Sequence, residues 1–145
     1  MIEVLLVEDD PGDVLMTREA FADNHATNVL HVVSDGVLAM DFLHKRGDYV
    51  DAPTPDLMLL DLNLPRMDGR EVLAAVKGDP LLRQIPVVVL TTSEAEQDVL
   101  RSYELYANAY VTKPLHLDDL TRAVTRIDEF FAQIATLPMP VPEAS

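Results

Sequence analysis

Short apolar stretches alternate with longer amphipathic ones along this chain. Five apolar stretches predict β-strands over residues 2–7, 29–33, 56–60, 86–90 and 109–112. The periodicity between and after them predicts helices over about residues 11–25, 36–47, 70–77, 94–106 and 117–135. Strand and helix therefore alternate five times. This pattern predicts an α/β domain with a doubly wound, five-stranded parallel sheet and helices on both faces.

Local signals predict the ends and the apolar faces of the first two helices. Asp10 is the expected cap of the first helix, and Pro11 suits its first turn. The second helix is expected to begin at Asp35-Gly36 and to end near Gly47. We expect the first helix to bury Val14, Leu15, Phe21 and Ala22. The apolar side chains of the second helix are Val37, Leu38, Met40, Phe42 and Leu43.

The last helix has a continuous apolar stripe and one aromatic residue beside it. The stripe consists of Leu117, Leu120, Val124, Ile127, Phe131 and Ile134. Phe130 points about 100° away from Phe131 on a helix and lies off this stripe, which suggests a partner surface. Tyr103 and Tyr106, three residues apart, form either an exposed aromatic pair that joins Phe130 in a dimer interface or part of the core. We therefore expect one domain over residues 1–127, a C-terminal helix extension with a proline-rich tail over 128–145, and a homodimer that uses this extension.

Composition and charge exclude several classes of function. The chain of 145 residues has 11 basic and 25 acidic side chains, a net charge of −14, and no cysteine. This charge opposes direct binding to nucleic acid or to anionic lipid. The absence of cysteine excludes disulfides, thiolate metal sites and a cysteine nucleophile. No signal peptide or membrane-spanning stretch is evident, so the expected location is the cytoplasm.

Charged and hydroxyl side chains follow the predicted strands, where ligands bind in open α/β sheets. Glu8, Asp9 and Asp10 follow the first strand, and Asp61 follows the third. Clustered carboxylates repel one another unless a cation offsets the charge, and Mg²⁺ prefers such oxygen ligands. We expect Asp9 and Asp61 to bind Mg²⁺ directly, Glu8 to act through water, and the backbone carbonyl of Asn63 to supply a further ligand.

Asp61 is the candidate nucleophile of this edge. A carboxylate attacks a phosphoryl group to form an aspartyl-phosphate. Lys113, after the fifth strand, offers a compact positive charge, and Thr91, after the fourth, offers a hydroxyl to a phosphoryl oxygen. For each residue alone, an ordinary surface lysine or an ordinary strand-end hydroxyl is the better interpretation. Their joint placement at one edge favours a functional site.

Four motifs together resemble those of response-regulator receiver domains (CheY-like). They are Val7-Glu8-Asp9-Asp10, the segment from Asp61 to Gly69, the segment from Pro86 to Thr91, and Tyr110-Val111-Thr112-Lys113-Pro114. The resemblance covers residues 1–127 and implies the flavodoxin-like strand order 2-1-3-4-5. It also implies phosphoryl transfer from a histidine kinase to Asp61 with Mg²⁺, a contact of Lys113 with the phosphoryl group, and a switch in which Thr91 and Tyr110 move.

A narrower resemblance concerns the small receivers paired with phytochrome-type histidine kinases. It rests on Asp10-Pro11-Gly12-Asp13-Val14, on Pro53 and Pro55, and on the segment from Ile127 to Phe131. It implies a stand-alone regulator that signals through contacts with a downstream protein, because no DNA-binding module is expected after Ser145.

Alternative functions remain open at this stage. The chain is equally compatible with a phosphorelay intermediate, and less so with a receiver-like interaction module that is never phosphorylated. A haloacid-dehalogenase-type phosphatase would need an acid where Asn63 stands, so we expect a phosphoacceptor and no turnover enzyme. A flavodoxin would need a phosphate-binding loop of hydroxyl and glycine residues after the first strand, which is absent here.

Overall fold

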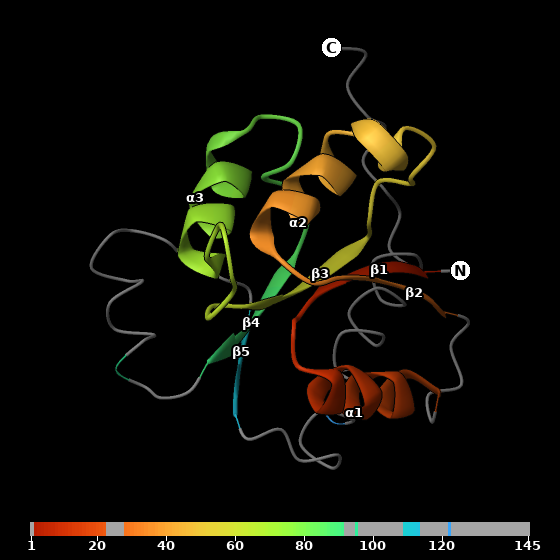
Figure 1. Cartoon of the computed structure of the whole chain (residues 1–145), viewed down its shortest axis with the longest axis vertical. Helices are drawn as coiled ribbons and strands as arrows, with labels where there is room; N and C mark the ends of the chain where they lie inside the picture. Colours follow the sequence, from red (N-terminus) through yellow and green to blue (C-terminus); the bar gives the residue numbers. More distant parts are fainter. Residues whose placement is uncertain (1, 23–27, 92–94, 96–108, 114–121, 123–145) are drawn as a thin grey trace, which may run out of the picture.

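The computed structural model describes residues 2–22, 28–91, 95, 109–113 and 122. Its elements are β1 (Ile2–Val7), α1 (Pro11–Ala22), β2 (Asn28–Val33), α2 (Gly36–Leu43), a 3₁₀ turn η1 (Gly47–Tyr49), β3 (Leu57–Asp61), α3 (Gly69–Gly78), β4 (Val87–Thr91) and β5 (Ala109–Thr112). Figure 1 shows their arrangement. The helices expected over residues 94–106 and 117–135, the tail, and Tyr103, Tyr106 and Phe130 lie outside the described residues. None of the helices in the described part is long and apolar enough to cross a membrane.

The sheet is parallel, and its central strand order β2-β1-β3-β4 confirms the prediction. β3 is paired on both sides, with Leu60 opposite Val7 of β1 and Val89 of β4. The backbone of β5 pairs with β4, with Thr112 opposite Thr91. Because all strands run the same way, the ends of β1, β3 and β4 meet at one edge of the sheet.

Side chains of the central strands point alternately to the two faces of the sheet, where they are buried in two separate hydrophobic cores. Met58 and Leu60 pack on the side of α2 and α3, together with Leu73. Leu57 and Leu59 face the opposite side, where Phe21 of α1 covers them. All side chains of β3 are buried, as expected for a central parallel strand. Figure 1 shows α2 and α3 on one face of the sheet and α1 on the other, so the predicted layering is confirmed.

The predicted buried face of α1 is partly wrong. Phe21 is buried and Val14 is half-buried, whereas Leu15 is 58% exposed and Ala22 is exposed. Thr17 takes a buried place because its hydroxyl donates to the carbonyl of Asp13 at 2.8 Å, so its polar atom has a partner inside the helix. A sequence pattern that counts threonine as polar therefore wrongly assigns Leu15, and not Thr17, to the buried face of α1.

The second helix begins as predicted and ends earlier. Asp35 caps α2, because its Oδ1 accepts a hydrogen bond from the N–H of Leu38 at 2.8 Å. The helix stops at Leu43, four residues before Gly47. Lys45 adopts a left-handed φ of 56° just after the helix, and its ammonium donates to the carbonyl of Ala52 at 3.0 Å. The helix stop is thus made by a lysine, and Gly47 begins η1 instead.

Candidate functional site

Three carboxylates gather at the edge where β1 and β3 end. Glu8 and Asp9 follow β1, and Asp61 is the last residue of β3. One oxygen of each carboxylate lies within 4.8 Å of one oxygen of the other two. Glu8 and Asp61 are buried, with 1% and 2% exposed, and Asp9 is exposed. The strand pairing of the sheet, with Val7 opposite Leu60, brings these sequence-distant acids together as predicted.

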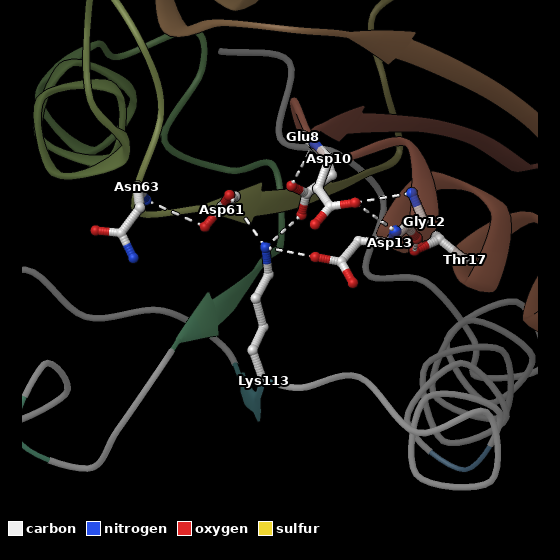
Figure 2. A network of polar contacts seen from close by, with 8 residues as sticks. All are labelled: Glu8, Asp10, Gly12, Asp13, Thr17, Asp61, Asn63 and Lys113. Carbon is white, nitrogen blue, oxygen red and sulfur yellow. Dashed lines mark hydrogen bonds and ion pairs between the residues drawn. The ribbon is translucent and has the colours of Figure 1, made fainter.

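The carboxylate of Asp61 is held on both of its oxygens. Oδ1 accepts a hydrogen bond from the N–H of Asn63 at 3.1 Å, and Oδ2 accepts one from Nζ of Lys113 at 3.1 Å. Figure 2 shows the side chain between these two partners. Asp61 is therefore fixed in orientation by its own loop and by a residue 52 positions later in the chain.

Lys113 lies among three carboxylates. Its Nζ is 2.8 Å from Oε2 of Glu8, 2.8 Å from Oδ2 of Asp13 and 3.1 Å from Oδ2 of Asp61 (Figure 2). Burial lowers the pKa of Lys113, but its contacts with Asp13, Glu8 and Asp61 outweigh that effect, so the pKa is raised above its ordinary value. The side chain is therefore a permanently charged cation directed at the carboxylate of Asp61.

Glu8 is the carboxylate most affected by burial. Burial raises the pKa of Glu8 from 4.5 to about 7, and the negative charge of Asp61 acts in the same direction. The contact with Lys113 and a hydrogen bond from the N–H of Asp10 to Oε1, at 3.1 Å, oppose this increase. Burial therefore outweighs these contacts and makes Glu8 harder to ionise than an ordinary glutamate.

The donors of this cluster fit a divalent cation. Two carboxylates at 4.8 Å repel each other by about 3 kcal/mol at an effective dielectric constant of about 20. One lysine ammonium offsets only part of this repulsion among several acids. Carboxylate oxygens are hard ligands of the kind that Mg²⁺ and Mn²⁺ bind. Glu8, Asp9 and Asp61 would hold such an ion, while the predicted role of the Asn63 carbonyl stays a prediction.

The loop that follows Asp61 is packed tightly against the start of α2. A Cβ on Gly36 would lie 2.0 Å from the carbonyl oxygen of Met67, and a Cβ on Gly69 would lie 2.2 Å from that of Asp61. Between these glycine contacts, the guanidinium of Arg66 pairs with Oδ2 of Asp35 at 2.7 Å. These contacts fix the backbone that carries Asp61 and Asn63.

The structure brings together four of the predicted site residues and adds one that the sequence reasoning missed. Glu8, Asp9, Asp61 and Lys113 converge as described above. Asp10 caps α1, as expected, because its Oδ1 accepts from the N–H of Gly12 at 2.8 Å. The fifth member of the group is Asp13, which was not among the predicted site residues. Its place in the first turn of α1 carries no sequence signal for a contact with a lysine so distant in the chain.

Two further predicted residues, Thr91 and Tyr110, are described by their backbone only. Thr91 ends β4 at the same edge as Asp61. Tyr110 lies in β5, opposite Val89 of β4. These backbone positions agree with the predicted placement, and the roles of both side chains stay predictions.

Comparisons with known proteins point to one family. The profile of the response regulator receiver domain matches residues 4–125. The response regulator Rcp1 of Synechocystis sp. is 48% identical over 135 residues, which cover 93% of this chain and 92% of Rcp1. A crystal structure of the Mn²⁺-bound form of Rcp1 has a TM-score of 0.79 and 45% identity, and covers 97% of this chain and 100% of that chain. A crystal structure of the phosphorylated cyanobacterial phytochrome response regulator RcpA has a TM-score of 0.79 and 47% identity, with coverage of 95% and 99%.

The family profile and the geometry agree on the same edge of the sheet. The matched range includes the acidic cluster after β1, Asp61 at the end of β3, and Lys113 after β5. The parallel order of the central strands is the order that the resemblance implied. The chain belongs to the family of response regulator receiver domains.

Proposed function

We propose that this protein is a single-domain response regulator that accepts a phosphoryl group on Asp61 from a histidine kinase. The observation that carries the proposal is the buried carboxylate of Asp61, with Oδ2 at 3.1 Å from Nζ of Lys113, inside a cluster of acids that fits a divalent cation. The similarity to a phosphorylated response regulator supports this assignment.

In the proposed transfer, an oxygen of Asp61 attacks the phosphorus atom of the kinase's phosphohistidine. The Oδ–P bond forms as the N–P bond breaks, and the imidazole leaves with the electron pair. Lys113 stabilises the negative charge on the phosphoryl oxygens with its ammonium. The N–H of Asn63 holds Oδ1 of Asp61, which leaves the carboxylate in one orientation during the attack.

We assign the cation to Mg²⁺, held directly by Asp9 and Asp61, by Glu8 through water, and by the backbone carbonyl of Asn63. When bound, it would neutralise charge on the oxygens of the incoming phosphoryl group. The hard carboxylate donors of the cluster support this assignment, as does the Mn²⁺-bound form of the relative Rcp1.

The proposed output is a change of surface that a partner protein binds. Thr91 would donate its hydroxyl to the phosphoryl group, and Tyr110 would change position in response. The similarity to a phytochrome response regulator supports a phytochrome-type histidine kinase as the phosphodonor. A downstream protein target, a homodimer and a location in the cytoplasm complete the proposal, without direct contact to DNA or membrane.

Two alternatives differ in what happens to the phosphoryl group. A relay intermediate would pass it on to a histidine of another protein, whereas a terminal regulator would lose it to water. A receiver-like module that is never phosphorylated would keep Asp61 unmodified. We favour the phosphoacceptor, because Asp61 and Lys113 are in contact and three carboxylates that could hold a cation lie together at this edge.

The test is incubation with Mg²⁺ and a small phosphodonor such as acetyl phosphate, followed by intact-mass spectrometry. We expect the mass of one added phosphoryl group in the wild-type protein and none in Asp61→Asn, which retains the shape of the side chain but not the nucleophile. Chelation of the cation should abolish this increase in mass. An unmodified wild-type protein under these conditions, or equal modification of Asp61→Asn, would contradict the proposal. Sedimentation equilibrium of the same samples measures dimerisation before and after modification.

A further inference from the structure

Asp13 extends the site beyond the residues that the cation cluster contains. Its Oδ2 lies 2.8 Å from Nζ of Lys113, and the two side chains are only 21% and 15% exposed. Figure 2 shows Asp13 and Asp61 reaching the ammonium from different elements, α1 and β3. The contact is therefore part of the site, although Asp13 is remote from Asp61 in sequence.

The first turn of α1 fixes the position of Asp13. Oδ1 of Asp10 accepts from the N–H of Gly12 at 2.8 Å and from that of Asp13 at 3.4 Å. The hydroxyl of Thr17 is bound to the carbonyl of Asp13 at 2.8 Å. Because the backbone on both sides is held, the Asp13 carboxylate is presented to Lys113 without further ordering of the chain.

The three carboxylates around Lys113 differ in what else they do. Glu8 and Asp61 also belong to the group that fits a divalent cation, whereas Asp13 lies outside that group among the residues that the structure describes. A bound cation would neutralise part of the negative charge of Glu8 and Asp61, and its positive charge would repel the ammonium of Lys113. Asp13 is then the carboxylate that still attracts Lys113 into the site.

We propose that Asp13 is a positioning residue. It holds the ammonium of Lys113 beside Asp61 while Glu8 and Asp61 interact with the cation and Asp61 accepts the phosphoryl group. The inference rests on the proposed function and adds to it a residue that acts through Lys113. The ammonium carries three N–H donors and has three carboxylates in contact. With Asp13 in place, one donor stays anchored and the others are free to meet the phosphoryl oxygens.

A purely local role for Asp13 is the competing explanation. An acid in the first turn stabilises a helix through its dipole, and any acid near the site increases the attraction for a cation. Asp10→Asn provides the matched control, because it removes one negative charge from the same turn and keeps an oxygen for the cap. Of Asp10 and Asp13, only Asp13 has an ion pair with Lys113 among the described residues. An effect confined to Asp13→Asn therefore reports the contact and not the charge.

The first measurement is the affinity for beryllofluoride, a phosphoryl mimic, at saturating Mg²⁺, by isothermal titration calorimetry. We expect Asp13→Asn to weaken binding by roughly 5- to 20-fold, as for loss of a charge-assisted hydrogen bond, and Asp10→Asn by less than about 2-fold. Asp13→Glu, which keeps the charge, should recover part of the loss. Equal affinities of Asp13→Asn and Asp10→Asn would overturn the proposal. A wild-type protein that binds no beryllofluoride and accepts no phosphoryl group would instead overturn the proposed function.

The second measurement follows Lys113 directly and does not depend on phosphorylation. The chain has three lysines, Lys45, Lys77 and Lys113, so the NMR signals of their ε-methylene groups are few, and Lys113→Arg identifies the relevant one. In the wild-type protein we expect this signal to stay away from the position of a solvated lysine when Mg²⁺ is added. In Asp13→Asn it should move to that position with Mg²⁺. A signal that behaves alike in both proteins would refute the anchoring role even if Asp13→Asn folds less stably.

Discussion

The buried carboxylate of Glu8 makes a quantitative prediction about stability without metal. Burial raises its pKa from 4.5 to about 7, so the folded protein holds the Glu8 proton more tightly than the unfolded chain does. The stability that this proton contributes is fully present below pH 4.5 and is lost as the pH rises through about 7. A shift of this size corresponds to about 3 kcal/mol once Glu8 is ionised in both states.

The perturbation is Glu8→Gln, which keeps the size of the side chain and an oxygen for the N–H of Asp10. Glutamine does not titrate. The free energy of unfolding of the variant, relative to that of the wild-type protein, should therefore rise by about 2 kcal/mol between about pH 5 and pH 7, and change little more above that. Urea unfolding in the presence of a chelator, followed by circular dichroism, measures the free energy of unfolding at each pH. Glu19→Gln, on the exposed side of α1, is the control for losing one glutamate.

The decisive quantity is the difference between wild type and Glu8→Gln, since other titrating groups cancel in it. A difference that stays constant from about pH 5 to pH 8 would refute the argument that burial governs Glu8. A difference that shrinks with pH would show that the contact with Lys113, and not burial, dominates the pKa of Glu8.

Other predictions concern the loop after β3 and its anchor on α2. Gly36→Ala should lower the free energy of unfolding by about 1–3 kcal/mol, because its Cβ would lie 2.0 Å from the backbone oxygen of Met67, whereas Gly78→Ala meets nothing within 4 Å and should be neutral or stabilising in the same urea titration. Arg66→Asn tolerates the left-handed φ of 64° but loses the ion pair with Asp35, and should cost about 0.5–1 kcal/mol at low salt. The loss should shrink in high salt, and an undiminished loss would point to packing instead of charge.

Much of the fold was predictable because its signals are local and repeated. The apolar runs gave the strands to within a residue or two, since a central parallel strand such as Leu57–Asp61 is apolar on both faces. The cap at Asp35 was predictable from residue type alone. Convergence of Glu8, Asp61 and Lys113 followed from the rule that parallel strands end at one edge.

The errors arose where a local hydrogen bond, a local backbone conformation or a contact distant in sequence overrides what residue type predicts. Thr17 is buried in place of Leu15 because a hydrogen bond within the helix satisfies its hydroxyl. The second helix stops at Leu43 because Lys45 takes the left-handed conformation that a sequence pattern assigns to glycine. Asp13 escaped prediction for a related reason, since an acid in a first helical turn has the same sequence signature whether or not it reaches a lysine 100 residues later.

The ammonium of Lys113, in contact with three acids, acts as a built-in counter-ion for the pocket. Proteins whose folding depends on a bound metal collapse when the metal is withdrawn, because nothing else balances their ligands. In this protein the ammonium of Lys113 lies beside the carboxylates of Glu8 and Asp61 whether or not a metal is bound. The protein should therefore stay folded during purification and storage in chelating buffers. The metal can then be added afterwards, so that its occupancy is set by the experimenter and is not required for folding.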